Sequence, residues 1–215
     1  MTMPTPVPGR GTDRRTAILD AAAVEFDRQG FGAASIAGIA KAAGVSQGAI
    51  HFHFRTKQAI ALGVIDEQNA RTFAAVTFAD PSPLGGLVVA SRTIAGLLLE
   101  DPVVRAGIRL SLENRVFSGA TSAFYDQWIA SVVDVFRLAV AAGEVDSTVS
   151  AEALGATVVP WFTGVQLVSD VRAARADLLP AVGTMWRVLT HACVAPAHRV
   201  RLLAVVDRAF ACPPA

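Results

Sequence analysis

Apolar residues recur at intervals of three and four along almost the whole chain, and no stretch sustains an alternation of apolar and polar residues. This spacing predicts α-helices rather than β-strands. In residues 13–29, for example, Ile18, Ala22 and Phe26 form one apolar stripe. Gly30 follows, and a glycine just past a helix often takes the left-handed conformation that ends it. We therefore expect an all-α protein with about nine to ten helices.

Two short helices and a tight turn are predicted next. Ser35 is a good N-cap, and apolar residues at positions 36, 39, 40 and 43 share one helical face. The letters AGVS then provide Gly44 for a tight turn and Ser46 as the N-cap of a third helix, SQGAIHF. Two short helices joined by a glycine turn predict a helix-turn-helix. A fourth, longer helix is expected from about residue 56 to residue 78.

The segment ADPSPLGG is predicted to be a turn, and five or six further helices are expected after it. Their ranges are 84–99, 102–114, 123–142, 151–175, 178–193 and 197–211. Residues 153–169 carry no charge, but the run is short for a membrane span, contains Thr, Gln and Ser, and has Pro160 in its middle. We interpret this run as a helix that the protein itself buries, with a kink at the proline.

Composition and charge suggest two functional parts. Hydrophobic residues make up 53% of the 215 residues, so a core, a pocket or a subunit interface must bury the excess. Residues 1–57 carry a formal charge of +3, whereas the remainder carries −2. A basic N-terminal part on a slightly acidic body is typical of a protein whose N-terminal part reads nucleic acid.

No feature of the sequence predicts an enzyme or a cofactor. There is no phosphate-binding loop, dinucleotide fingerprint, GxSxG or HExxH motif. His51 and His53 are two residues apart, so on a helix they point in directions that differ by roughly 200° and cannot chelate one ion. Cys193 and Cys212 have no CxxC spacing, and the N-terminus lacks an apolar signal segment. We expect a reduced, cytoplasmic protein with no metal site.

The third helix suits the major groove of DNA. Such a helix needs small residues where its backbone approaches the duplex and polar residues near base edges or phosphates, and Ser46, Gln47 and Gly48 meet both needs. Lys57, at the start of the fourth helix, suits a phosphate. Phe52 and Phe54 are predicted mainly as packing rings, one against the first helix and one against the fourth.

Residues 16–60 resemble the DNA-binding head of the TetR family of bacterial repressors. The matching features are the first helix ending in FDRQGF, the core SIAGIAKAAGVSQGAI, and the aromatic pair before FRTK. About 45 residues match densely. One difference is His51, which stands where the family usually has tyrosine. An imidazole is shorter and can be charged, so a phosphate contact from it would depend on pH.

This resemblance implies a homodimer whose two heads bind a palindromic operator in double-stranded DNA and are released by a small molecule. It divides the chain into a disordered arm (residues 1–12), a helix-turn-helix head (13–57), and a ligand-binding and dimerisation body (58–215). The dimer face is expected on the helices around residues 151–175 and 178–193, with part of the last helix. The residues expected to contact DNA are Ser35, Ser46, Gln47, Gly48, His51, Phe52 and Lys57.

The body resembles the γ-butyrolactone receptor branch, whose members bind diffusible lactone, butenolide or furan signals and control antibiotic production. The similar segments are DPVVRAGIRLSLE, FYDQWIASVVDVFRLAVAAGEVDSTV, FTGVQLVSD and MWRVL. The likeness implies that Trp128 and Trp186 line the walls of a pocket and that Gln166 forms a hydrogen bond with the polar head of the signal molecule. A site for an acyl-chain lactone needs flat apolar walls and a few polar groups. Two helical stripes supply them, namely Phe124, Trp128, Val132, Val135 and Ala139 on one helix and Phe162, Gln166 and Ser169 on another. The expected ligand-binding residues are Trp128, Phe162, Gln166, Ser169 and Trp186.

Alternatives stay open at this point. Trp128 and Trp186 could be core tryptophans, and Gln166 a polar residue satisfied at an interface. A TetR-type repressor that senses a drug or another metabolite, controlling efflux or catabolism, is the second functional hypothesis. A helical enzyme or scaffold without a DNA function is the third.

Overall fold

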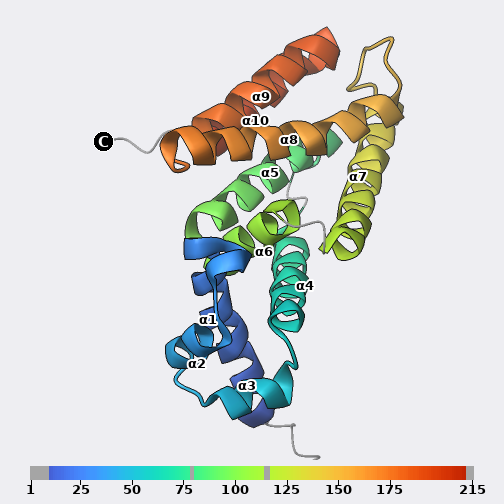
Figure 1. Ribbon diagram of the computed structural model, residues 1–215. Helices are drawn as coiled ribbons and strands as arrows, with labels where there is room; N and C mark the ends of the chain where they lie inside the picture. The colour runs from blue at the N-terminus through green and yellow to red at the C-terminus, as the bar shows by residue number, and fades with distance from the viewer. Residues whose placement is uncertain (1–9, 78–79, 114–116, 212–215) are drawn as a thin grey trace, which may run out of the picture. The chain divides into compact units, whose positions relative to one another are not determined.

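The computed structural model describes residues 10–77, 80–113 and 117–211, and these ranges contain ten helices and no strand (Figure 1). The helices are α1 (Arg10–Ala33), α2 (Ile36–Ala42), α3 (Gln47–His53), α4 (Lys57–Ala75), α5 (Pro83–Glu100), α6 (Pro102–Glu113), α7 (Ser118–Ala141), α8 (Ala151–Ala173), α9 (Leu178–Cys193) and α10 (Pro196–Phe210). The all-α prediction is therefore confirmed. Most of the predicted disordered arm, and Cys212, lie outside the described residues.

The chain groups into two compact units. Unit 1 comprises residues 1–71 and 101–121, and unit 2 comprises residues 72–100 and 122–215. Unit 1 thus contains α1, α2, α3, most of α4, and α6, which packs against α1. Its core is a cluster of buried side chains that includes Ile18, Phe26, Ile39, Ile50 and Ile60. The predicted division of function at residue 57 stays a prediction.

Charged groups also tie the helices of unit 1 together. The Arg71 guanidinium on α4 donates to Asp20 on α1 (2.9 Å), to Glu67 one turn earlier (2.9 Å) and to Asp101 (3.1 Å). Asp101 also accepts the backbone N–H of Val103 and so caps the start of α6. Partial burial alone would lower the pKa of Arg71, but the bonds to three carboxylates outweigh it and raise the pKa above its ordinary value.

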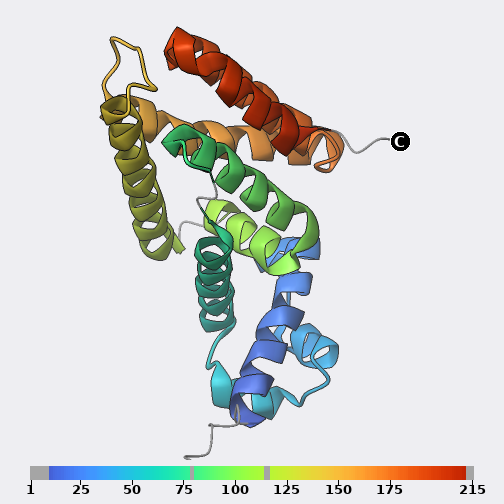
Figure 2. The same ribbon diagram turned by 180° about the vertical axis from the view of Figure 1, so that it is seen from behind.

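Unit 2 packs α5 against α9 and α10, and α9 against α8 (Figure 2). Among the described helices, α5 is the one apolar and long enough to cross a membrane by length and composition, but 61% of its apolar stretch is buried within the protein. The run 153–169 falls inside α8, which continues through Pro160 as one helix.

The two largest differences from the predicted helix boundaries lie at the end of α1 and the start of α7. α1 extends to Ala33, but Gly30 interrupts it with φ 75° and ψ 172°, so the expected break is present and one more turn follows. α7 begins at Ser118, five residues before the predicted start at 123. Ser118, Gly119 and Thr121 are weak helix formers, so propensity alone did not predict this first turn. Phe117, which is buried at its start, anchors it in unit 1.

Candidate DNA interface and ligand cavity

The turn between α2 and α3 forms as the sequence predicts. The hydroxyl oxygens of Ser35 and Ser46 accept hydrogen bonds from the backbone N–H groups of Gly38 (3.0 Å) and Ala49 (3.1 Å), and so cap α2 and α3. Gly44 takes the left-handed conformation between them, with φ 65°. Both caps and the glycine turn are confirmed, and together they fix the start of α3.

The two sides of α3 differ sharply in exposure. Ile50 is fully buried in the unit 1 core, whereas five residues predicted to contact DNA are exposed. These five are Ser46, Gln47, Gly48, His51 and Phe52. A short helix with one buried anchor and an exposed, mostly polar opposite side can enter a major groove.

The two phenylalanines at the end of α3 have different surroundings. Phe54 is buried in the unit 1 core, where the Arg15 guanidinium of α1 lies 5.3 Å from its ring centroid. Phe52 is 84% exposed, so the prediction that it packs against another helix is wrong. The residue lies on the exposed side of α3, where burying its ring would turn the polar residues of the helix inward.

Lys57 is bonded within unit 1. Its ammonium donates to three backbone carbonyls, those of Phe31, Gly32 and Ala34. The predicted phosphate contact from Lys57 stays a prediction, and it would require the ammonium to leave at least one of these carbonyls. His53 is half-buried, and its ring meets that of Phe52 edge to face.

Unit 2 contains a mostly apolar cavity of about 170 Å³. Trp128 lines it from α7, together with side chains from the end of α4 and from α5. The lining residues are Thr72, Phe73, Val76, Leu87, Ala90, Ile94, Phe124, Trp128, Ser131 and Val132. Sequence reasoning found the α7 wall from its helical stripe. It missed the α4 and α5 walls, although Leu87, Ala90 and Ile94 also share one helical face.

Aromatic rings surround Trp128. Its ring centroid lies 5.8 Å from that of Phe124, 6.1 Å from Tyr125 and 6.0 Å from Phe162, which α8 contributes. Burial raises the pKa of the Tyr125 hydroxyl, although its hydrogen bond with Thr163 opposes this rise. The structure thus brings the rings of two predicted ligand residues, Trp128 and Phe162, into contact.

The other predicted ligand residues lie in different surroundings. Gln166 is 2% exposed, and its side-chain oxygen accepts no hydrogen bond from the described residues. The Ser169 hydroxyl is bonded to Asp177 at 2.5 Å. The Trp186 indole N–H donates to the Ser91 hydroxyl at 2.6 Å, and the ring is buried in the core of unit 2. Of the five predicted ligand residues, Trp128 lines the cavity described above, whereas Phe162, Gln166, Ser169 and Trp186 do not.

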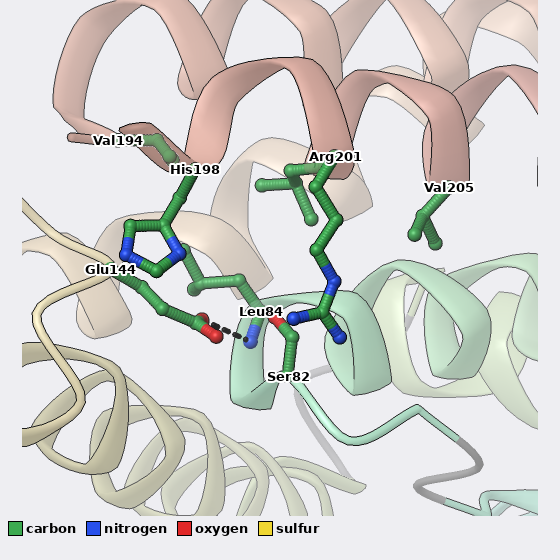
Figure 3. Close-up of a pocket in the computed structure, with 8 residues that line it drawn as sticks. Ser82, Leu84, Glu144, Val194, His198, Arg201 and Val205 are labelled. Atoms are coloured by element: carbon green, nitrogen blue, oxygen red, sulfur yellow. Dashed lines mark hydrogen bonds between the residues drawn. The ribbon is translucent and has the colours of Figure 1, made fainter. Parts of the chain in front are cut away.

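A second pocket in unit 2 is too small for a metabolite. Its volume is about 10 Å³, barely enough for one water molecule. Figure 3 shows Glu144, His198 and Arg201 around the start of α5, where the Glu144 carboxylate accepts the backbone N–H of Leu84 at 3.2 Å. Glu144 is nearly fully buried and pairs the Leu84 amide, and the Ser82 hydroxyl accepts the Gly85 amide, so these two side chains cap the start of α5. The buried carboxylate of this pocket is therefore explained by helix capping, without a bound ligand.

Comparison with known proteins places the chain in a family. The family model for bacterial regulatory proteins of the tetR family matches residues 18–64. A second model, for the C-terminal domain of tetracyclin repressor-like proteins, matches residues 81–195, more than half of the chain.

Individual relatives agree with these matches. The A-factor receptor protein of Streptomyces griseus is 39% identical over 171 residues, which cover 79% of this chain but only 60% of the receptor. The structure of TylP, a TetR regulator from Streptomyces fradiae, is 32% identical, with a TM-score of 0.74 over 94% of this chain and 100% of that one. CprB from Streptomyces coelicolor, solved with its operator, shares the fold at 24% identity, with a TM-score of 0.82 over 94% and 99% of the two chains. The chain therefore belongs to the TetR family of bacterial regulatory proteins.

Proposed function

We propose that this protein is a transcriptional repressor, not an enzyme, that acts in the cytoplasm and leaves its operator when a γ-butyrolactone-like signal binds. The observation that carries the proposal is the aromatic cavity at Trp128, in the same chain as an exposed recognition helix. The names of its relatives support the ligand class, because they include an A-factor receptor and proteins of the same fold called γ-butyrolactone receptors. Control of antibiotic production is the role we infer.

The cavity suits a ligand with an acyl chain and a small polar ring. Its walls are mainly apolar, and the buried oxygen of Gln166 lies one helical turn beyond Phe162 on α8. Residues four apart lie on the same side of a helix, so we infer that a signal that widens the cavity past Phe162 would donate a hydrogen bond to this oxygen. The side chains that line the cavity carry no formal charge, which argues against lipophilic cations as the releasing agents.

The ligand would act through α4. The cavity of about 170 Å³ is smaller than the roughly 300 Å³ at which small-molecule sites usually begin, so a signal would have to widen it. Thr72 and Phe73, in the last turn of α4, line the cavity, and the same uninterrupted helix begins at Lys57, directly after α3. A ligand that favours the wider cavity shifts the population of α4 positions, and a coupling of about 1–3 kcal/mol changes operator affinity roughly 5- to 150-fold.

The protein is proposed to act as a homodimer, with α8 and α9 at the interface. Exposed apolar residues gather on these helices, and Val171 is 86% exposed and Val168 54%. Two copies that pair through these residues would bring two recognition helices to one palindromic operator.

The test is to select duplexes from a random-sequence pool with the full-length protein and to titrate the complex with a γ-butyrolactone that carries a medium-length acyl chain. We expect a palindromic consensus and release of the duplex by the lactone. Failure to enrich any duplex would refute the repressor. Enrichment of a duplex that only drugs or other metabolites release would instead favour the drug- or metabolite-sensing alternative.

A further inference from the structure

The Lys57 side chain is half-buried, and its ammonium makes three hydrogen bonds within unit 1. Its Nζ lies 2.8 Å from the Phe31 carbonyl oxygen, 3.3 Å from that of Gly32 and 2.8 Å from that of Ala34. It also lies 4.6 Å from the centroid of the Phe31 ring. An ammonium has three hydrogens, so three carbonyls use its full donor capacity.

These contacts join the two ends of the helix-turn-helix. Residues 31–34 come directly before Ser35, the N-cap of α2, and Lys57 is the first residue of α4 after α3. Gly30 interrupts the hydrogen-bond pattern of α1, so the carbonyls that follow it need partners from elsewhere. The Lys57 ammonium supplies these partners. It thereby joins the segment before α2 to the start of α4, with α2 and α3 between them.

Phe31 is held in place from both sides. Its ring centroid lies 6.0 Å from that of Phe26 and 5.2 Å from that of Phe117, which meets it edge to face. Phe26 and Phe117 are almost fully buried in the unit 1 core. The cation–π attraction between an ammonium and such a fixed, partly desolvated ring is stronger than the same attraction at an exposed site.

Arg55 has a positive charge that is free to contact DNA, whereas the Lys57 ammonium is bonded within unit 1. It lies between Phe54, the C-cap of α3, and the start of α4, and it is exposed. No hydrogen bond or ion pair joins its guanidinium to the described residues. An unpaired guanidinium at the end of a recognition helix is well suited to a phosphate.

We propose that Lys57 is a positioning residue, which clamps the helix-turn-helix through residues 31–34, and that Arg55 is the phosphate-binding cation at this end of α3. The proposal rests on the proposed repressor function. The Lys57 ammonium then fixes the orientation of α3, and the exposed Arg55 guanidinium makes the salt-sensitive contact with a DNA phosphate.

The test compares two variants of the full-length protein that each remove one positive charge and keep an unbranched side chain, Lys57→Met and Arg55→Met. The probe is a duplex that the unmodified protein selects from a random-sequence pool, and its affinity is measured over a series of salt concentrations. Each phosphate contact contributes about 0.9 to the slope of log affinity against log salt. We expect Arg55→Met to reduce the slope by about this amount. Lys57→Met should keep the slope but weaken binding roughly tenfold or more at every salt concentration.

Two further variants separate the clamp from a phosphate anchor without removing charge. An arginine at position 57 would bind a phosphate at least as well as lysine, but its planar fork does not match three converging carbonyls. Under the proposal, Lys57→Arg and Phe31→Leu both weaken DNA binding. The clamp is refuted if Lys57→Met reduces the slope as Arg55→Met does, or if Lys57→Arg and Phe31→Leu both bind like the unmodified protein.

Thermal unfolding gives a readout that does not depend on DNA. Lys57→Met should lower the unfolding temperature by several degrees, and Arg55→Met should leave it unchanged. Equal unfolding temperatures for the Lys57→Met variant and the unmodified protein would overturn the clamp. If the unmodified protein enriches no duplex, the repressor function fails, and the unfolding comparison still decides the role of Lys57.

Discussion

Gln166 is the residue whose chemistry is least explained by the fold alone. It is 2% exposed, and its side-chain oxygen lacks a hydrogen-bond partner among the described residues. Leaving a buried acceptor unpaired costs about 1–3 kcal/mol, so this unpaired amide oxygen on α8 is consistent with a site that awaits a donor. The hydroxyl of a signal molecule would supply that donor.

We expect Gln166→Leu to separate stability from signal response. Leucine is similar in size and removes the unpaired acceptor, so the unfolding temperature should stay the same or rise. DNA binding should be unaffected, whereas the lactone concentration needed for release should increase roughly tenfold or more. Calorimetry and lactone titration of the DNA complex measure the two effects. An unchanged lactone response would remove Gln166 from the site.

Residue-level reasoning from the sequence was correct where a local rule decides the outcome. The caps at Ser35 and Ser46 and the positive φ of Gly44 depend only on neighbouring residues, and all three are confirmed. The surroundings of Phe52 and Trp186 depend on side chains far along the chain. Spacing could not show that Phe52 is exposed, or that Ser91 accepts the indole N–H of Trp186.

At the scale of elements, periodicity predicted most helices to within a few residues. The predicted range 178–193 matches α9 at both ends, and α5, α8 and α10 agree closely with their predicted ranges. The largest error, at the start of α7, arose because the packing of Phe117 in the unit 1 core outweighs the weak helix propensities of Ser118, Gly119 and Thr121. The α4 and α5 walls of the cavity were missed because pattern analysis shows which residues share a face but not which faces meet.

At Gly107, α6 lies close to the Gln68 side chain of α4. A Cβ added there would come 2.4 Å from the Cβ and 2.7 Å from the Cγ of Gln68, near the root of a buried side chain that cannot easily move aside. We expect Gly107→Ala to destabilise unit 1 by about 1–3 kcal/mol through overpacking. Denaturant unfolding measures this loss. Gly119→Ala is the control, because nothing lies within 4 Å of a Cβ at that position. Equal stability of the Gly107→Ala and Gly119→Ala variants would contradict the tight contact.

At the scale of the whole molecule, the exposed apolar residues of α8 and α9 need a partner. Val171 is 86% exposed, so Val171→Asp should leave the protomer folded. In a symmetric dimer the same substitution occurs twice and buries two unpaired carboxylates in an apolar interface, so the dimer dissociation constant should increase roughly tenfold or more. Sedimentation equilibrium measures it. Leu138→Asp, at a 61% exposed position on α7, is the control and should have no effect. A Val171→Asp protein that dimerises as well as the control would place the interface elsewhere.

The most direct test of the central claim is the lactone response of Trp128→Ala, compared with Leu138→Ala on the same helix. Trp128 lines the cavity, whereas Leu138 is exposed and does not. The measurement is release of the selected duplex by an acyl-chain γ-butyrolactone. We predict that both variants bind the duplex normally and that Leu138→Ala releases it like the unmodified protein, whereas Trp128→Ala no longer responds. Normal release from Trp128→Ala would contradict the assignment of this cavity as the signal-binding site.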